Sequence, residues 1–211
     1  MIFALLPVKS PKNAKQRLNG FLPPPQREAL ARLMYEHTIG ALCGARGIDC
    51  VVVVTSDGEI AEHARGAGAL VFAEGQQSSH SLSADAACLH ALELGATTVL
   101  LVPIDVPLVT AEDFSRLAAA ARPGVVVVPS SDGTGTNALV RTPPDVIESC
   151  FGPDSFRAHL EQASRKGVAA EVLRLPGLMF DIDTPGDVAE LLERAPDNRV
   201  ASFLRSVCAS K

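Results

Sequence analysis

Long apolar runs and an excess of positive charge are both missing from this 211-residue sequence. No run approaches the ~18 apolar residues of a membrane span, and the apolar segment at residues 1–8 is too short for a signal peptide. The sequence therefore predicts a soluble, cytoplasmic protein without membrane contact. The formal net charge is −5, from 19 Lys and Arg against 24 Asp and Glu. This balance disfavours a nucleic-acid-binding protein, which normally carries a basic surface.

Cysteine and histidine patterns of metal sites or nucleophilic catalysis are absent as well. The five cysteines include no Cys-x-x-Cys pair, so they predict reduced thiols rather than disulfides or a zinc site. The histidines form no His-Glu-x-x-His motif, and no serine lies in a Gly-x-Ser-x-Gly turn. Zinc-dependent and serine-dependent hydrolysis are therefore disfavoured, and each histidine is expected to be a structural or a surface residue. These residues are Cys43, Cys50, Cys88, Cys150, Cys208, His37, His63, His80, His90 and His159.

Apolar, β-branched runs alternate with segments of helical spacing, which predicts an α/β fold. The runs are almost continuously hydrophobic, as expected of strands that are covered on both faces of a mostly parallel sheet. With 47% hydrophobic residues and no linker or repeat, residues 1–211 are expected to form a single domain. The expected strands are residues 2–8, 50–55, 69–73, 98–103, 125–129 and 172–175, and the expected helices are residues 24–43, 59–65, 83–94, 111–121, 154–166, 185–194 and 198–208.

Four cations follow the first expected strand, in the nine residues from Lys9 to Arg17. Ligands of open α/β sheets bind at the carboxyl ends of the strands, so this loop lies where a ligand is expected. Lysine supplies a point charge and arginine a bidentate fork, which together suit a polyphosphate. A solvated basic loop is the competing interpretation.

Three aspartates follow the later expected strands. Asp105 stands between two prolines, and Asp181 and Asp183 are two residues apart, so they face the same side of an extended segment. Hard oxygen ligands at this spacing suit Mg²⁺. The alternatives are a turn cap for Asp105, and a helix N-cap formed by Asp183 or Thr184.

Two glycine-containing segments offer backbone N–H groups to an anion. The loop Asp132-Gly-Thr-Gly-Thr-Asn137 lies at a strand end, where glycine permits close approach of the backbone to a ligand. The segment Phe151-Gly-Pro-Asp-Ser-Phe156 precedes an expected helix, and helix N-termini bind phosphate. Either segment is also explained as a plain turn or helix start.

Five motifs occur in order along the chain: Pro7-Val-Lys with Ala14-Lys-Gln-Arg-Leu18, Pro103-x-Asp-x-Pro107, Asp132-Gly-Thr-Gly-Thr-Asn-Ala-Leu139, Phe151-Gly-Pro-x-Ser-Phe156 with His159, and Asp181-x-Asp-Thr-Pro185. Together they resemble the phospholactate guanylyltransferase family of coenzyme F420 biosynthesis, nearly from end to end. The resemblance implies a Rossmann-like, three-layer nucleotidyltransferase domain of the GT-A-like type. It also implies transfer of GMP from GTP to 2-phospho-L-lactate, phosphoenolpyruvate or 3-phospho-D-glycerate, with release of pyrophosphate.

The resemblance further implies roles for individual residues. The metal ligands, which would hold Mg²⁺, correspond to Asp105, Asp181 and Asp183. The triphosphate clamp corresponds to Lys9, Lys15 and Arg17, and the pocket for the acid corresponds to Thr136, Gly152 and Ser155. Asp105 and the three cations are thereby the expected catalytic and nucleotide-binding groups.

The chain departs from the family at Ser81-Leu82-Ser83, where the family usually has Gly-Leu-Asn. The resemblance places this segment, including Ser83, beside the nucleotide, so the choice of guanine stays open. Two other functions also remain: a nucleotidyltransferase for a sugar phosphate or a molybdopterin phosphate, and a nucleotide-binding module without activity. The expected partners are GTP and a small phosphorylated acid, and the sequence leaves the oligomeric state open, a homodimer included.

Overall fold

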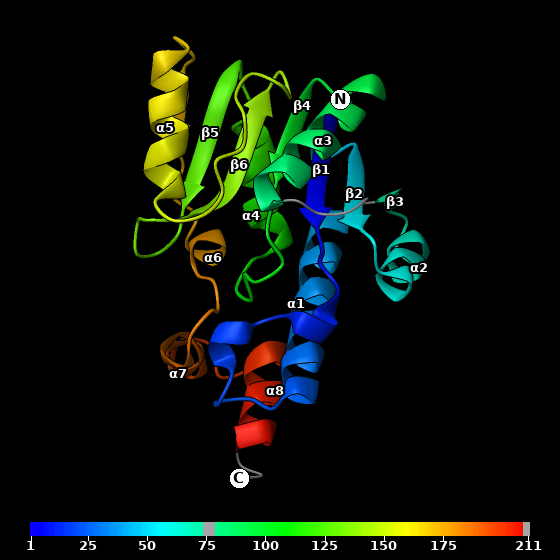
Figure 1. Cartoon of the computed structure of the whole chain (residues 1–211), viewed down its shortest axis with the longest axis vertical. Coiled ribbons are helices and arrows are strands. Elements are labelled where there is room, and N and C mark those ends of the chain that lie inside the picture. The colour runs from blue at the N-terminus through cyan, green and yellow to red at the C-terminus, as the bar shows by residue number, and fades with distance from the viewer. Residues whose placement is uncertain (74–78, 209–211) are drawn as a thin grey trace.

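A seven-stranded sheet forms the centre of the computed structural model, which describes residues 1–73 and 79–208 (Figure 1). Its strands lie in the order β3-β2-β1-β4-β6-β5-β7. Neighbouring strands are parallel except at β6, which runs antiparallel to both β4 and β5. The strands are β1 (Ile2–Pro7), β2 (Cys50–Thr55), β3 (Leu70–Ala73), β4 (Thr98–Leu101), β5 (Gly124–Pro129), β6 (Thr136–Thr142) and β7 (Ala170–Val172).

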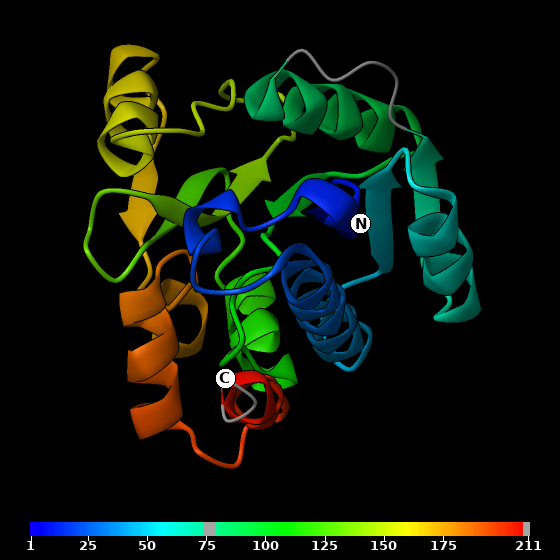
Figure 2. The ribbon, with the colours of Figure 1, turned by 60° about the horizontal axis from the view of Figure 1, so that its bottom comes forward.

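Helices cover both faces of the sheet, so the strands are buried from two sides. Helices α1, α2, α4 and α6 pack on one face, and α3 and α5 pack on the other (Figure 2). Side chains of β1 alternate between the two faces. Ala4 and Leu6 pack in the core on the α1 face, and Phe3 and Leu5 pack in the core on the α3 face. This arrangement confirms the expected α/β, three-layer fold. The helices are α1 (Pro24–Cys43), α2 (Gly58–Gly66), α3 (His80–Glu93), α4 (Ala111–Ala119), α5 (Ser155–Arg165) and α6 (Pro176–Met179).

A third apolar cluster lies beyond the carboxyl ends of the parallel strands, at the bottom of Figure 1. It combines the first half of α1 with α7 (Pro185–Arg194) and α8 (Arg199–Cys208). Because α1 is 20 residues long, it contributes Met34 to this cluster and Ile39 to the sheet core. The long helix therefore fixes the helical cluster against the sheet. None of the helices in the described ranges is long and apolar enough to cross a membrane.

The sequence located most elements but missed β6. This strand begins with Thr136 and Asn137, and it also carries the buried Arg141, so its polar residues hide the strand pattern. The last expected strand, residues 172–175, is displaced as well, because β7 ends at Val172 and Leu175 is the buried residue that precedes α6. The antiparallel strand β6 therefore lies in a segment that the hydrophobic pattern does not predict as a strand.

Leu100 tests the sheet core, because it lies in β4 with no exposed surface. Replacing it by alanine removes buried methyl groups and leaves a cavity, so Leu100→Ala should lower the free energy of unfolding by ~2–5 kcal/mol. Urea denaturation followed by circular dichroism measures the change. The matched control is Leu89→Ala on α3, where the side chain is 53% exposed and the change should stay within ~0.5 kcal/mol. Equal losses in the two variants would contradict the central position of β4.

Candidate active site

The loop after β1 and the loop after β4 meet at one edge of the sheet. The first loop forms two short 3-10 helices, η1 (Pro11–Asn13) and η2 (Gln16–Leu18), with Lys15 between them. Lys15 has a left-handed backbone with φ of 51°, which side-chain-bearing residues rarely adopt. Because β4 lies parallel and adjacent to β1, the segment that carries Asp105 leaves the sheet at the same edge.

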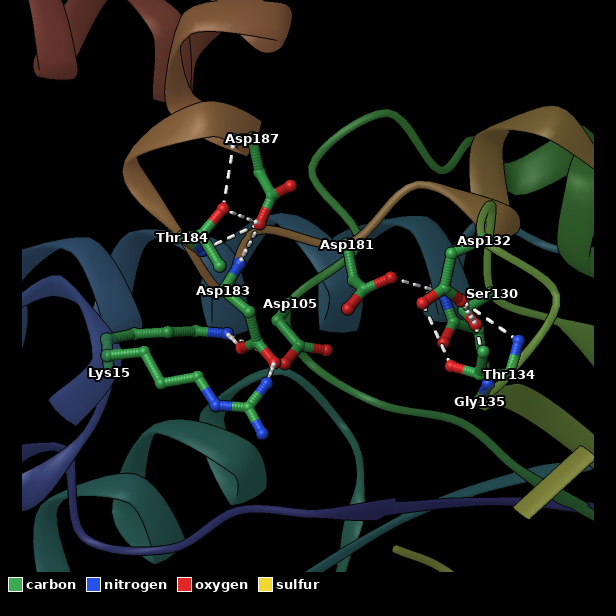
Figure 3. Close-up of polar contacts among 12 residues, drawn as sticks. Lys15, Asp105, Ser130, Asp132, Thr134, Gly135, Asp181, Asp183, Thr184 and Asp187 are labelled. Carbon is green, nitrogen blue, oxygen red and sulfur yellow. Dashed lines mark hydrogen bonds and ion pairs between the residues drawn. The ribbon is translucent and has the colours of Figure 1, made fainter. Parts of the chain in front are cut away.

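The ammonium of Lys15 joins two of the three aspartates (Figure 3). Its Nζ lies 2.7 Å from Asp105 Oδ2 and 2.9 Å from Asp183 Oδ1. Arg17 Nη1 lies 3.0 Å from Asp183 Oδ2, but its side chain is 75% exposed against 8% for Lys15. Burial lowers the pKa of Lys15, but the two carboxylates outweigh it and hold the pKa above its ordinary value. Burial likewise acts against ionisation of Asp105, yet Lys15 keeps the pKa of Asp105 below its usual range.

Asp183 is available to these cations because a neighbouring residue caps α7. Thr184 Oγ1 accepts a hydrogen bond from the Asp187 N–H, and the Asp187 carboxylate accepts one from the Thr184 N–H, which forms a capping box. The Ile182 N–H donates to the Asp105 carbonyl oxygen at 3.0 Å. The segment before α7 is therefore tied to the loop after β4, and both carry an aspartate into the same region.

Asp181 is held by a different partner, the side chain of Asn137 on β6. Asn137 Nδ2 lies 2.9 Å from Asp181 Oδ1 and 3.0 Å from the carbonyl oxygens of Leu178 and Met179. Asn137 is buried, so its amide depends on these partners. It therefore positions the chain that leads from α6 to the aspartate pair.

Negative charge accumulates where the three aspartates approach one another. Burial raises the pKa of Asp181, and the charges of Asp105 and Asp183 raise it further against the opposing hydrogen bond from Asn137. Within residues 1–73 and 79–208, no group of three or more His, Cys, Asp or Glu side chains is arranged to hold a metal ion. Lys15 lies between two of the carboxylates, and Asp181 is bound to the amide. The donors are nevertheless hard oxygens, and Mg²⁺ commonly takes only one or two carboxylates, so the chemistry of these side chains suits this ion.

The cations and two of the aspartates line one cavity of about 450 Å³. Lys9, Lys15 and Arg17 line it from the loop after β1, and Asp105 and Asp183 line it from the two segments that Lys15 joins. The volume lies in the range of small-ligand sites. The structure therefore brings five of the expected site residues to one cavity.

A smaller cavity adjoins this one, because both are lined by Pro7, His80 and Pro103. The remaining wall of the smaller cavity includes Thr136 at the start of β6 and Phe151 before α5. We refer to these two adjoining cavities together as the cleft, which has a cationic end and an end that contains Thr136.

A β-bulge sets the direction of the Asn137 side chain at the start of β6. Val128 pairs with Ala138 and Pro129 pairs with Thr136, so Asn137 is an extra residue in β6. In a regular strand, adjacent side chains point to opposite faces of the sheet. Here Asn137 reaches α6, on the same face as Ala138, whereas Thr136 contacts His159 of α5 on the other face; both residues line the smaller cavity.

The glycine-rich turn before β6 is closed by its own hydrogen bonds (Figure 3). Asp132 Oδ1 accepts from the Ser130 hydroxyl at 2.5 Å and from the Thr134 N–H at 3.0 Å. The Gly133 N–H donates to the Ser130 carbonyl oxygen at 3.0 Å, and the Gly135 N–H donates to Ser130 Oγ at 2.7 Å. Both glycine N–H groups are therefore engaged inside the turn, and the residues that follow them face the cleft.

Four expected site residues are not among those that line either cavity: Asp181, which Asn137 holds, and Ser83, Gly152 and Ser155. Ser83 lies in the first turn of α3, where its hydroxyl donates to the Ser79 carbonyl oxygen at 3.0 Å. Gly152, with φ of 133°, directly follows Phe151 of the smaller cavity. Ser155 is the buried first residue of α5. Ser83, Gly152 and Ser155 are close in sequence to His80 or Phe151, which line the cleft. Their contacts with substrates are taken up below as proposals.

Several residues that line the cleft were not in the expected site, among them His80 and Asn137. His80 lies at the start of α3, and no local motif marks it. The sequence gives one indication for Asn137: it is a polar residue directly before the apolar run Ala138-Leu-Val. Such a position is typical of the start of a strand that borders a polar site. The contact of Asn137 with Asp181 spans 44 residues, so the sequence alone does not indicate the pairing.

Comparison with known proteins identifies the family of this chain. The family described as "Guanylyl transferase CofC like" matches residues 2–210. The phosphoenolpyruvate guanylyltransferase of Sphaerobacter thermophilus is 39% identical over 197 residues, which are 92% of this chain and 93% of that protein. The 3-phospho-D-glycerate guanylyltransferase of Colwellia psychrerythraea is 34% identical, with 89% of each chain covered. The 2-phospho-L-lactate guanylyltransferase of Methanothermobacter thermautotrophicus is 30% identical, with 97% of this chain and 90% of that protein covered.

Solved structures of nucleotidyltransferases share the fold. A nucleotidyl transferase from Methanothermobacter superposes with a TM-score of 0.65 at 18% identity, covering 98% of this chain and 99% of that one. The 4-diphosphocytidyl-2C-methyl-D-erythritol synthase of Anaerococcus prevotii superposes with a TM-score of 0.62 at 12% identity, covering 97% and 96%. At these identities the likeness concerns the fold alone, whereas the family match spans nearly the whole chain. The chain belongs to the CofC-like guanylyl transferase family.

Proposed function

We propose that this enzyme transfers GMP from GTP to a small phosphorylated three-carbon acid and releases pyrophosphate, as a step in coenzyme F420 biosynthesis. The observation that carries the proposal is the cleft in which three cations and two carboxylates line one end and Thr136 lines the other. Relatives that cover most of the chain are named as guanylyltransferases for three such acids. The acid is therefore drawn from phosphoenolpyruvate, 3-phospho-D-glycerate and 2-phospho-L-lactate.

The reaction joins two polyanions, so charge neutralisation is the main task of the protein. Two like unit charges ~4 Å apart repel by roughly 4 kcal/mol at an effective dielectric constant of 20. Lys9, Lys15 and Arg17 line the cavity from one loop and are assigned to the phosphates of GTP. Their positive charge also stabilises the negative charge that develops on the departing pyrophosphate.

The attack itself needs no general base. A phosphomonoester has its second pKa near 6, so the phosphate of the acid is mostly a dianion at pH 7. One of its oxygens forms a bond to the α-phosphorus of GTP while the bond to the pyrophosphate oxygen breaks in line. The protein contributes by holding the two reactants in this geometry.

We assign Asp105, Asp181 and Asp183 to Mg²⁺, because their oxygens are the donors that this ion prefers. Bound Mg²⁺ supplies further neutralisation of phosphate oxygens. Lys15 now lies between Asp105 and Asp183, and the phosphates of GTP offer its ammonium another anionic partner in the same cavity.

We assign Thr136, Gly152 and Ser155 to the acid. Thr136 lines the smaller cavity, and Ser155 begins α5, whose N-terminus favours a bound anion. The base of GTP is assigned to the first turn of α3, which carries Ser83 and places His80 in the wall of both cavities. The phosphates of GTP are therefore assigned to the cationic end of the cleft, and the acid to the end that contains Thr136.

A pyrophosphate-release assay tests the reaction directly. Purified protein with Mg²⁺ is given each of the three acids with GTP, and ATP and CTP serve as control nucleotides. We expect release with GTP and with one preferred acid, because the cleft offers one anion subsite beside the cationic end. Release with a sugar phosphate instead of all three acids would replace the proposed substrate class. No release with any pair would identify an inactive nucleotide-binding module.

Asp183→Asn tests the aspartate site, since it keeps the size of the side chain and removes its charge. We expect kcat/KM to fall by about 100-fold or more, because a preorganised charge contact in the cleft is lost. The matched control is Asp197→Asn, an exposed position between α7 and α8, which should leave the rate unchanged. Circular dichroism should show that both variants are folded. A near-normal rate for Asp183→Asn would remove Asp183 from the site.

Ser155→Ala tests the acid subsite. The substitution should raise the KM for the acid by about 10-fold, the cost of one hydrogen bond to a charged group, while the KM for GTP changes little. Ser164→Ala, at an exposed position later in α5, is the matched control. Equal increases in both KM values would exclude Ser155 from specific contact with the acid.

A further inference from the structure

We propose that His159 is a positioning residue for the acid subsite: it holds the Thr136 hydroxyl so that its proton points toward the bound acid. This inference rests on the proposed function, because it assigns Thr136 to the acid. His159 lies on α5 and is fully buried, and the reaction described above gives it no role. Its two ring nitrogens contact two different parts of the wall around the smaller cavity.

The hydrogen bonds of His159 determine which nitrogen carries the proton. The backbone N–H of Cys150 donates to Nε2 at 2.9 Å, and a backbone N–H has no other role than donor. Nε2 must therefore be unprotonated. Nδ1 lies 3.0 Å from Thr136 Oγ1, so in the neutral ring it carries the proton and donates to that oxygen.

The neutral state of the ring agrees with this assignment. Burial lowers the pKa of His159 to about 4, and the charge of Arg141 acts in the same direction. The Ser155 backbone and the Asp85 carboxylate act in the opposite direction without outweighing it. The ring is therefore uncharged near pH 7, and one nitrogen remains free to accept from Cys150.

The orientation of the Thr136 hydroxyl follows from its contact with His159. When Thr136 Oγ1 accepts a proton from Nδ1, its own O–H cannot point back at the same nitrogen. Thr136 lines the smaller cavity, so its O–H is available there as a donor. The carboxylate and phosphate oxygens of the acid accept hydrogen bonds only, which makes a preset donor favourable for binding.

His159 also supports the chain on the other side of the cavity. Its contact with the Cys150 N–H fixes the residue directly before Phe151, which lines the smaller cavity. The rings of Phe151 and His159 pack edge to face, with centroids 5.2 Å apart. One imidazole thus connects β6, α5 and the segment between them.

Two variants separate the contacts of the two ring nitrogens. In His159→Asn, the side-chain amide reaches the position of Nδ1 and keeps a donor for Thr136. In His159→Gln, it reaches the position of Nε2 and keeps an acceptor for Cys150 but loses the donor. We expect the KM for the acid to rise by about 10-fold in His159→Gln and to stay within about 3-fold in His159→Asn, with the KM for GTP unchanged in both.

The same variants are then made with Thr136→Val, which removes the hydroxyl. In this background the difference between Asn and Gln at position 159 should disappear, because His159 acts through Thr136. Persistence of the full difference, or equal KM values for the acid in the two single variants, would overturn the positioning role while leaving the proposed function intact. Wild-type protein without pyrophosphate release would overturn the proposed function and, with it, this role of Thr136.

Nitrogen-15 NMR of the wild-type histidine rings gives a readout that does not depend on turnover. His159 should show a protonated Nδ1 and an unprotonated Nε2 from about pH 6 to pH 8, since its pKa is about 4. The His159→Gln spectrum identifies its signals by their loss. An imidazolium, or a proton on Nε2, would overturn the proposed orientation of Thr136.

Discussion

The ammonium of Lys15, held between Asp105 and Asp183, is the contact on which the arrangement of the cleft depends. It joins the loop after β1, the loop after β4 and the segment before α7. Removal of charges from water is costly, so a nearly buried ammonium is stable only with its anionic partners in place. The contact orders three distant segments and also keeps a cation where the phosphates of a nucleotide can attract it. The same side chain, Lys15, therefore both orders the three segments and supplies positive charge to the cavity.

The two ends of the cleft are built by different parts of the fold. The cationic end depends on the parallel strands β1 and β4 and on the helical cluster that anchors the aspartate segment. The other end depends on β6, on α5 and on the chain between them. Asn137 connects the two, since it lies on β6 and binds Asp181.

The sequence was sufficient to predict the α/β class and most helices and strands, because continuous apolar runs and proline-marked helix starts are local signals. It also indicated Lys15 and the aspartates, which follow such runs. It did not indicate that Lys15 binds Asp183, since 168 residues separate them and only the folded sheet brings them together. His159 was expected to be structural for the same reason, because its partners lie on other elements. β6 was missed because its first residues are polar, and those residues are the ones that face the cleft.

The bulge at the start of β6 has a consequence for how this site can tolerate changes in chain length. The extra residue, Asn137, lies on the same face of the sheet as Ala138, so its amide reaches Leu178 of α6 and Asp181. Deletion of a single residue between Pro129 and Ala138 would restore regular pairing, and alternation would then turn the residue before Ala138 toward the opposite face, away from α6 and Asp181. The cleft therefore depends on the number of residues in this hairpin as strictly as on their identity, although turns between antiparallel strands commonly accept insertions and deletions.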